Sequence, residues 1–428
     1  MKKLILVVLI FSSILATGQT LVPFLKENGK YTYVEYTTMK PAINQEFDLR
    51  QSIWTANGMR SDLPEIFLSD YVVVNKAGKS IIIDKKGKSY LNNFDGVDDF
   101  RNGVAIIVLK NKKGLATLKG ETLLIPKYDI LYSISPNYFI GQIGAKADLI
   151  DNTGKIVYPV KYNEIEFMSG KCLKYIINGK AGMIDNEGKV LLPPIFEPTE
   201  LNSPYSCGLV KVESDGWIGY KNNENKLVIP LMFEKGDDFS EDRAAVQYTT
   251  ENNEIISGYI DTNGKFIWKM KGRMKLNPYH DGYALVQNSL GNFYIDKDGV
   301  VKLLLGGFIE SSDEVKSYYK NEIENINKLV ISKQCIIVPN PKGYELGNPN
   351  DFYEGLARIG LGMPGGNYTP SLLYLDKSGK VVIPVIKGEG GDFNNGFSSI
   401  SRTKEYFKIN QGYYIDKEGR EYIENYEK

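Results

Sequence analysis

The stretch that decides the fold reads Met183-Ile184-Asp185-Asn186-Glu187-Gly188-Lys189-Val190-Leu191-Leu192-Pro193. An apolar pair is followed by an acid, two polar residues, a glycine and a lysine, and then by an apolar run that ends in proline. The carboxylate of Asp185 can accept hydrogen bonds from backbone N–H groups further on, which closes a turn. Gly188 supplies the positive φ that a type I turn with a G1 bulge requires. The stretch therefore predicts two antiparallel strands joined by a tight turn.

The same stretch recurs along the chain, for example from Leu149 to Pro159 and from Tyr374 to Pro384. A degenerate earlier copy is expected at Tyr33-Val34-Glu35. Because the copies repeat at a mean spacing near 37 residues, they predict one array rather than the roughly three domains that 428 residues would indicate. The positions that align with Asp185 are Asp84, Thr117, Asp151, Asp185, Asn222, Asp261, Asp296, Ile331, Asp376 and Asp416.

A second element precedes each turn and consists of an aromatic residue, two further residues, a glycine and alternating apolar positions. Examples begin at Phe100, Tyr279 and Phe352. One repeat therefore reads as strand, hairpin loop, strand, tight turn, strand, proline and an aromatic return segment, where the proline is interpreted as the end of the strand. A calcium loop needs several oxygen ligands at alternate positions. Since each turn offers a single acid, we interpret these acids as structural.

The pattern resembles the WG-type repeats, which run aromatic-x-x-Gly-apolar-Ala and then Trp-Gly-Tyr-Ile-Asp-x-x-Gly-Lys, an apolar run and proline. The glycine before the apolar pair is present as Gly114, Gly182, Gly219 and Gly258, whereas the tryptophan is mostly absent and Trp217 is its nearest equivalent. The resemblance covers about residues 29–420. It implies a bacterial all-β repeat array without catalytic residues.

The expected fold class is all-β, with tandem repeats of short antiparallel strands stacked in an array that is either open and superhelical or propeller-like. A three-stranded unit cannot bury both of its faces alone, so neighbouring repeats must stack. Propellers usually close at 4–8 blades, so a single closed ring is not expected to use every copy. One segment departs from the pattern. A capping box at Ser311–Glu314 and helical spacing from Val315 predict an amphipathic helix near residues 313–328, inside an insertion at about 311–329.

The first residues are interpreted as an export signal. Lys2 and Lys3 precede an apolar stretch from Leu4 to Ala16, and Ala16-Thr17-Gly18 places small residues before a cleavage site at Gln19. This predicts a signal peptide at 1–18, a single repeat domain at 19–428, and a periplasmic, cell-surface or secreted location in the cell envelope. No later stretch reaches transmembrane length, so no integral membrane segment is expected after cleavage.

Composition excludes several classes of function. One histidine in the whole chain argues against histidine-based zinc sites and catalytic relays. The charges balance at 52 basic and 52 acidic residues, which argues against nucleic acid as a partner. Cys172, Cys207 and Cys335 do not form a disulfide framework and are interpreted as buried thiols. No catalytic residue, cofactor site or metal site is predicted, and the dinucleotide-like Gly360–Gly365 is interpreted as a loop because no helix can follow it.

Function is expected where the repeats carry insertions. From the glycine position of the aromatic element to the acid position, the short repeats count 14 or 15 residues, whereas three C-terminal repeats count 19, 21 and 20. All three expansions fall in the same hairpin loop, at Tyr248–Glu254, Gly360–Pro370 and Arg402–Gln411. The polar and aromatic residues expected to bind a partner are Asn252, Asn253, Asn367, Tyr368, Tyr406 and Phe407.

These observations predict an exported, non-enzymatic repeat protein that binds an extracytoplasmic protein or glycan through loops on one face. Two alternatives stay open. One is an exported hydrolase with a pair of carboxylates assembled between repeats. The other is a structural spacer without a ligand.

Overall fold

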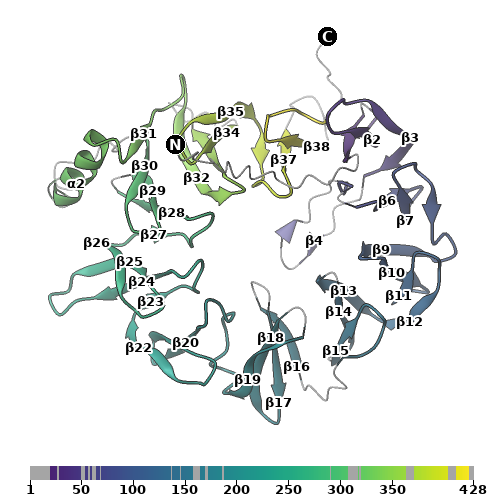
Figure 1. Cartoon of the computed structure of the whole chain (residues 1–428), viewed down its shortest axis with the longest axis horizontal. Coiled ribbons are helices and arrows are strands. Elements are labelled where there is room, and N and C mark those ends of the chain that lie inside the picture. Colours follow the sequence, from purple (N-terminus) through teal and green to yellow (C-terminus); the bar gives the residue numbers. More distant parts are fainter. Residues whose placement is uncertain are drawn as a thin grey trace, which may run out of the picture.

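The computed structural model describes residues 20–423 except for 27, 50–53, 56–57, 60–63, 68, 136, 145, 158–163, 169–171, 186–187, 290, 307–316, 318–319, 363–370 and 403–410. The predicted signal peptide at 1–18 lies outside this part. Short antiparallel sheets follow one another around a ring, so the all-β prediction is confirmed, and the array is propeller-like (Figure 1). A two-stranded hairpin of β4 (Trp54–Thr55) and β5 (Gly58–Met59) lies within the ring.

We number the repeat units blade 1 to blade 10 in chain order. Blade 1 contains β1 (Leu21–Leu25), β2 (Lys30–Glu35) and β3 (Pro41–Asp48), and blade 2 contains β6 (Tyr71–Lys76), β7 (Lys79–Asp84) and β8 (Ser89–Tyr90). Blade 3 contains β9 (Gly96–Arg101), β10 (Val104–Leu109), β11 (Lys112–Thr117) and β12 (Thr122–Tyr128), and blade 4 contains β13 (Ile130–Ser135), β14 (Tyr138–Ile143) and β15 (Lys146–Asp151). Blade 5 contains β16 (Glu164–Met168), β17 (Cys172–Ile177), β18 (Lys180–Asp185) and β19 (Val190–Phe196). Blades 1 and 2 share one sheet through the pair Asp48↔Asn75.

Blade 6 contains β20 (Val210–Ser214), β21 (Trp217–Lys221) and β22 (Leu227–Phe233), and blade 7 contains β23 (Lys235–Gly236), β24 (Ala244–Thr249), β25 (Ile255–Ile260) and β26 (Phe266–Lys271). Blade 8 contains β27 (Lys275–Leu276), β28 (Tyr283–Asn288), β29 (Gly291–Asp296), β30 (Val301–Leu305) and β31 (Ile336–Val338). Blade 9 contains β32 (Glu345–Tyr353), β33 (Leu356–Gly362), β34 (Ser371–Asp376) and β35 (Val381–Lys387), and blade 10 contains β36 (Glu389–Gly390), β37 (Phe397–Arg402) and β38 (Gln411–Asp416).

The tight turns form as the sequence predicts. In blade 9, Oδ1 of Asp376 accepts hydrogen bonds from the backbone N–H groups of Ser378 (2.8 Å) and Lys380 (3.1 Å), and Gly379 has a φ of 77°. Asn222 makes the same two bonds in blade 6, at 3.0 Å each. The side chain at this position therefore closes the turn, and its interpretation as structural is supported by geometry in the blades whose bonds are described.

The expectation that proline ends the outer strand is wrong, because proline lies inside this strand. Pro230 lies within β22 and Pro384 within β35, each beside a shift of register, and the strand continues to its last residues. The aromatic residue that follows, such as Phe233 (0% exposed), is the buried end of this strand. Since proline lacks an N–H donor, it also blunts an edge that could otherwise pair with another chain.

The repeated glycine before the apolar pair has a steric cause. A Cβ on Gly182 would lie 2.6 Å from the carbonyl oxygen of Leu192, and one on Gly258 would lie 2.4 Å from that of Trp268. Real Cβ atoms do not approach a backbone oxygen so closely, because the atoms would overlap. The outer strand therefore packs directly on the backbone of its neighbour at this glycine.

Aromatic residues join neighbouring blades, as the sequence predicts. The ring of Tyr259 in blade 7 lies 5.0 Å from that of Tyr279 in blade 8, and the Tyr259 hydroxyl donates to the carbonyl of Asn277 at 2.7 Å. The hydroxyl of Tyr374 likewise donates to Gly391 in blade 10 at 2.8 Å. Similar ring pairs link Tyr33 with Phe67, Tyr220 with Phe239, Tyr294 with Phe352 and Tyr374 with Phe393, at 4.8–5.0 Å.

The ring is closed by contacts between its first and last blades. The N–H of Leu25 donates to the carbonyl of Tyr422, and Leu25 pairs with Ile423. The ring of Tyr422 stacks on Tyr36 at 6.3 Å and meets Phe397 edge-on at 5.7 Å. The expectation that one closed ring would not use every copy is therefore wrong: ten blades share the ring.

The predicted helix is present but is placed differently. Helix α2 runs over Lys320–Ile331, whereas the prediction was 313–328, of which 313–316 and 318–319 lie outside the described residues. Ile326 (3% exposed) packs on the core between blades 7 and 8, so α2 covers the array. The helix connects β30 to the parallel strand β31. Ile331 is thus the last helical residue and not a turn position, which corrects its assignment as a repeat.

Candidate functional site

The two ends of the blades form two different faces of the ring. In blades 7 to 10 the second strand begins at the aromatic-x-x-Gly turn, with Asp242 in the glycine position of blade 7, and ends at a hairpin. The third strand returns to the turn closed by the acid. The face with both kinds of turn is called the turn face, and the face with the hairpins is called the hairpin face. Contacts between like turns of successive blades show that these blades point the same way.

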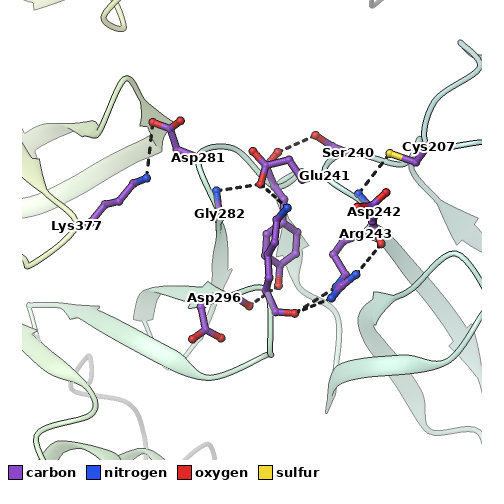
Figure 2. Close-up of polar contacts among 11 residues, drawn as sticks. Cys207, Ser240, Glu241, Asp242, Arg243, Asp281, Gly282, Asp296 and Lys377 are labelled. Atoms are coloured by element: carbon purple, nitrogen blue, oxygen red, sulfur yellow. Dashed lines mark hydrogen bonds and ion pairs between the residues drawn. The ribbon is translucent and has the colours of Figure 1, made fainter. Parts of the chain in front are cut away.

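On the turn face, an acid in one blade binds backbone N–H groups of the next (Figure 2). Glu241 Oε2 accepts from Gly282 at 2.9 Å, and Asp281 Oδ2 accepts from Gly355 at 2.7 Å. Glu354 accepts from Asn395 at 2.6 Å and Gly396 at 2.9 Å, completing the series in blade 10. In blade 6, Cys207 occupies the equivalent place, and its Sγ accepts from Asp242 at 3.3 Å.

Lysines that follow the turn acids pair with the same carboxylates. Lys297 Nζ lies 3.2 Å from Glu241, Lys417 Nζ lies 3.1 Å from Glu354, and Lys377 lies 4.0 Å from Asp281. Burial raises the pKa of Glu354, but the N–H of Gly396 and the Lys417 ammonium outweigh it, so the net pKa is lowered. These acids therefore serve as links between blades.

On the hairpin face, loop length separates two groups of blades. Short hairpins are two-residue turns in which both residues have positive φ, as at Asn178-Gly179 and Asp215-Gly216. This is the type I′ geometry that matches strand twist. The first expansion is longer: Thr250 and Glu254 close it through a backbone bond of 2.9 Å. The other two expansions include 363–370 and 403–410, which lie outside the described residues.

Two of the six predicted site residues can be placed. Asn252 and Asn253 are exposed on the Thr250–Glu254 loop, and Asn253 has a φ of 59°. Asn367, Tyr368, Tyr406 and Phe407 lie outside the part of the chain that the structure describes. Tyr248, at the start of the first expansion, packs with Phe233 and Phe266 and so belongs to the core.

A pocket of about 450 Å³ lies between blades 9 and 10, at the base of the second expansion. Gly360 and Gly362 line it, and both belong to β33, which corrects their interpretation as loop residues. Sequence reasoning missed the pocket because it treated these glycines as part of an insertion. The complete lining is Gly347, Asn348, Arg358, Gly360, Leu361, Gly362, Ser371, Leu372, Gly388, Glu389 and Gly390.

Two carboxylates of blades 9 and 10 influence each other: Asp351 in β32 and Asp392 just after β36. Burial raises the pKa of Asp351, and the charge of Asp392 raises it further, although the amide of Asn277 donates to it at 3.1 Å. Asp392 accepts two bonds from the Asn350 amide, at 3.0 and 3.2 Å, and pairs with Arg358 at 3.5 Å. Both carboxylates therefore have polar partners within the interface.

Other groups offer little further chemistry. Among the described residues, no cluster of His, Cys, Asp and Glu has metal-binding geometry, and no helix is long and apolar enough to cross a bilayer. The three cysteines are unpaired, and burial raises the pKa of Cys172 and that of Cys335, the latter to about 11. The ring of His280 stacks near that of Tyr353 at 4.9 Å.

The ring of repeated antiparallel blades defines a β-propeller-like repeat protein. The model of the family described as "WG containing repeat" matches residues 149–180 and 218–248. The chain therefore contains WG repeats at these two segments, as the turn and glycine patterns predicted. The search of curated proteins found no match.

Among solved structures, the chain is similar to apo AztD from Citrobacter koseri at 12% identity and a TM-score of 0.27, over 88% of this chain and 96% of that one. It is also similar to the AfRom2 CNH domain at 10% identity and a TM-score of 0.29, over 60% and 82%. A protein from Bacteroides caccae matches at 16% identity and a TM-score of 0.19, over 58% and 93%.

Proposed function

We propose that the protein is an exported, non-enzymatic binding scaffold whose hairpin face holds an extracytoplasmic protein or glycan. The observation that carries this proposal is the difference between the two faces. On the turn face, carboxylates and backbone donors are engaged in links between blades. The hairpin face carries the expanded Thr250–Glu254 loop and the pocket between blades 9 and 10. A scaffold whose loops vary while its frame stays fixed is a usual arrangement for binding.

Export is supported by the basic and apolar residues before Gln19. N-terminal sequencing and cell fractionation test this part of the proposal. We expect the protein recovered from the producing cell to begin at Gln19 and to fractionate outside the cytoplasm. N-terminal sequencing that finds Met1 on a cytoplasmic protein would contradict it.

The binding role is tested by shortening the loops. Asn-Gly replaces each of the three segments 250–254, 363–370 and 403–410. The same pair forms the natural two-residue turn at Asn178-Gly179. We expect the triple variant to keep its thermal stability and to lose capture of envelope components and signals on a glycan array. The matched control replaces Asp215-Gly216 by Asn-Gly, which leaves loop length unchanged and should keep all binding. Unchanged capture by the triple variant would show that the loops are not the site.

A hydrolase is the second candidate, favoured by the raised pKa of Asp351 beside Asp392. Its test is the double variant Asp351→Asn and Asp392→Asn. If the protein is a carboxylate hydrolase, the parent chain hydrolyses envelope glycans or peptides and the double variant does not. If it is a scaffold, replacing both acids changes no hydrolysis. A chain that neither binds nor hydrolyses any of these components would be a structural spacer.

A further inference from the structure

At the pocket between blades 9 and 10, glycine stands where the two preceding blades carry glutamine. Gln287 pairs with Asn292, four residues before the acid Asp296, and Gly360 pairs with Leu372, four residues before Asp376. Gln247 occupies the same position in blade 7, where it pairs with Ser257. Blade 9 therefore lacks a side chain at a position that faces the next blade.

Between blades 8 and 9, side-chain amides occupy the position that corresponds to this pocket. The amide of Gln287 donates to Asn292 at 3.0 Å, and the amide of Asn292 donates across the interface to the carbonyl of Gly347 at 3.3 Å. Between blades 7 and 8, Gln247 is buried, with 8% of its surface exposed. Of these three interfaces, only the one between blades 9 and 10 has glycine at this position.

Arg358 presents an unused donor at this pocket. Its Nε is buried and makes no hydrogen bond, because Asp392 Oδ1, at 3.5 Å, is near enough for an ion pair but does not have hydrogen-bond geometry. A buried donor without a partner is rare and indicates a missing water or ligand. Asn348 and the backbone of the glycine-rich segments at 360–362 and 388–390 add donors and acceptors.

The pocket carries no net charge. Asp392 compensates Arg358. A Cβ on Gly390 would lie 2.8 Å from Leu372, so the Gly390 side of β36 faces blade 9. Because side chains alternate along a strand, the adjacent Glu389, whose strand partner is Ser401, is directed to the other side. An anionic ligand would have to compete with Asp392 for the guanidinium.

We propose that this pocket binds a neutral saccharide unit. Sugar hydroxyls both donate and accept, so they match a small polar hollow that offers a guanidinium N–H, an amide and strand backbone without net charge. This inference rests on the proposed binding role of the hairpin face and narrows its partner to a neutral glycan. A volume of about 450 Å³ falls in the range of small-ligand pockets.

The first test fills the pocket with the side chain found in blades 7 and 8. In Gly360→Gln the new Cβ would lie 3.3 Å from the Asn348 carbonyl oxygen, which the strand can accommodate by a small shift. Glucose, galactose, mannose, N-acetylglucosamine and their disaccharides are titrated into the full chain by saturation-transfer NMR and calorimetry. We expect saturable binding of at least one neutral sugar, and a loss of at least about tenfold in the variant. Glucuronate should bind at least about tenfold more weakly than glucose.

The second test removes the donor without filling the space. Arg358→Met keeps an unbranched side chain of similar length, and we expect it to weaken sugar binding about tenfold or more. The matched control is Ser401→Gln, which places glutamine at the same position of blade 10. Ile400, its neighbour on β37, packs with Tyr374 of blade 9, so Ser401 faces away from the pocket and binding should be unchanged.

The inference is overturned if no neutral sugar binds, if glucuronate binds as well as glucose, or if Gly360→Gln binds sugar like the parent chain. Thermal unfolding of each variant separates lost binding from lost fold, and Arg358→Met carries the test if Gly360→Gln does not fold. Both variants keep the three expanded loops. If the parent chain binds no neutral sugar but captures envelope components in full, the inference fails and the proposed function stands.

Discussion

At the scale of single residues, the tyrosine two residues before the turn acid links one blade to the next in blades 7 and 9. Tyr259 and Tyr374 are fully buried, and each hydroxyl donates to the carbonyl that directly follows the inner strand of the next blade. Burial raises the pKa of Tyr374 to about 12, so its hydroxyl stays protonated at neutral pH. The aromatic content of the sequence predicted packing between repeats. It could not predict the hydroxyl bonds, because their acceptors are backbone groups of another blade.

The turn acids give the first prediction. Asp376→Ala should lower the free energy of unfolding by about 1 kcal/mol, because two backbone N–H groups lose their acceptor. Asp376→Asn should cost much less, since Asn222 closes the same turn in blade 6. Urea denaturation at neutral pH measures both changes. An equal loss in the two variants would contradict the structural role.

The same acid has a defined pH dependence. Burial raises the pKa of Asp376, but bonds from Ser378 and from the N–H of Lys380 outweigh it, so the folded-state pKa is lowered. Its stabilising contribution is therefore present above the usual carboxyl pKa and is lost as the pH falls through the folded value. Relative to Asp376→Asn, the parent chain should lose stability on acidification, as denaturation at a series of pH values will show.

At the scale of elements, the repeat pattern predicted most of the strands because each local signal agrees with the global fold. The apolar residues lie within β7 and β34, each strand ends at its turn acid, and the turn glycine follows three residues later. The assignment of Ile331 was wrong because a regular spacing was extended through an insertion. That insertion forms a helix, α2, whose Ile323 and Ile326 pack on the ring.

The glycine before the apolar pair gives the second prediction. Gly258→Ala should destabilise the protein by about 1–3 kcal/mol, because its Cβ would overlap the carbonyl oxygen of Trp268. Gly96→Ala is the matched control: it also lies in a strand, but its Cβ would be 4.0 Å from the nearest atom. Thermal and urea unfolding should separate the two variants. Equal stability would mean that the outer strand does not depend on this close approach.

The candidate site could be predicted only in part at this scale. The sequence correctly identified the hairpin in which blades 7 and 9 differ from the short blades, because loop length is readable from spacing. It could not identify Arg358 as a pocket residue, since the pocket forms only when β33 and β36 of separate blades meet. A comparison of aligned positions would have found one signal, glycine at 360 where Gln247 and Gln287 stand in the preceding blades.

At the scale of the whole molecule, the closed ring could not be deduced from copy number. Its closure depends on contacts between Tyr36 and Tyr422, which are specific to the first and last blades and repeat nowhere in the pattern. Arg420 adds to this contact, with its guanidinium 5.0 Å from the Tyr36 ring. Local signals predict the blades, whereas the end contacts determine that the ring closes.

The closure contact gives the third prediction. Tyr422→Ala should cost about 3–5 kcal/mol, because a fully buried ring is removed. It should also speed amide exchange in β1, whose Leu25 donates to Tyr422. Tyr413→Ala is the matched control, since Tyr413 is buried between blades 9 and 10, away from the closure. Hydrogen exchange that leaves β1 protected in Tyr422→Ala would contradict closure by this contact.

The distance in sequence between Tyr36 and Tyr422 also sets an order of events during synthesis. Each blade can pack on the preceding one as it leaves the ribosome, because its tyrosine and its links reach only one repeat ahead. The first blade, in contrast, must wait with its closing surface uncovered until residue 422 has been made. A nascent chain therefore stays an open arc for nearly the whole of translation and becomes a ring only in its final moments.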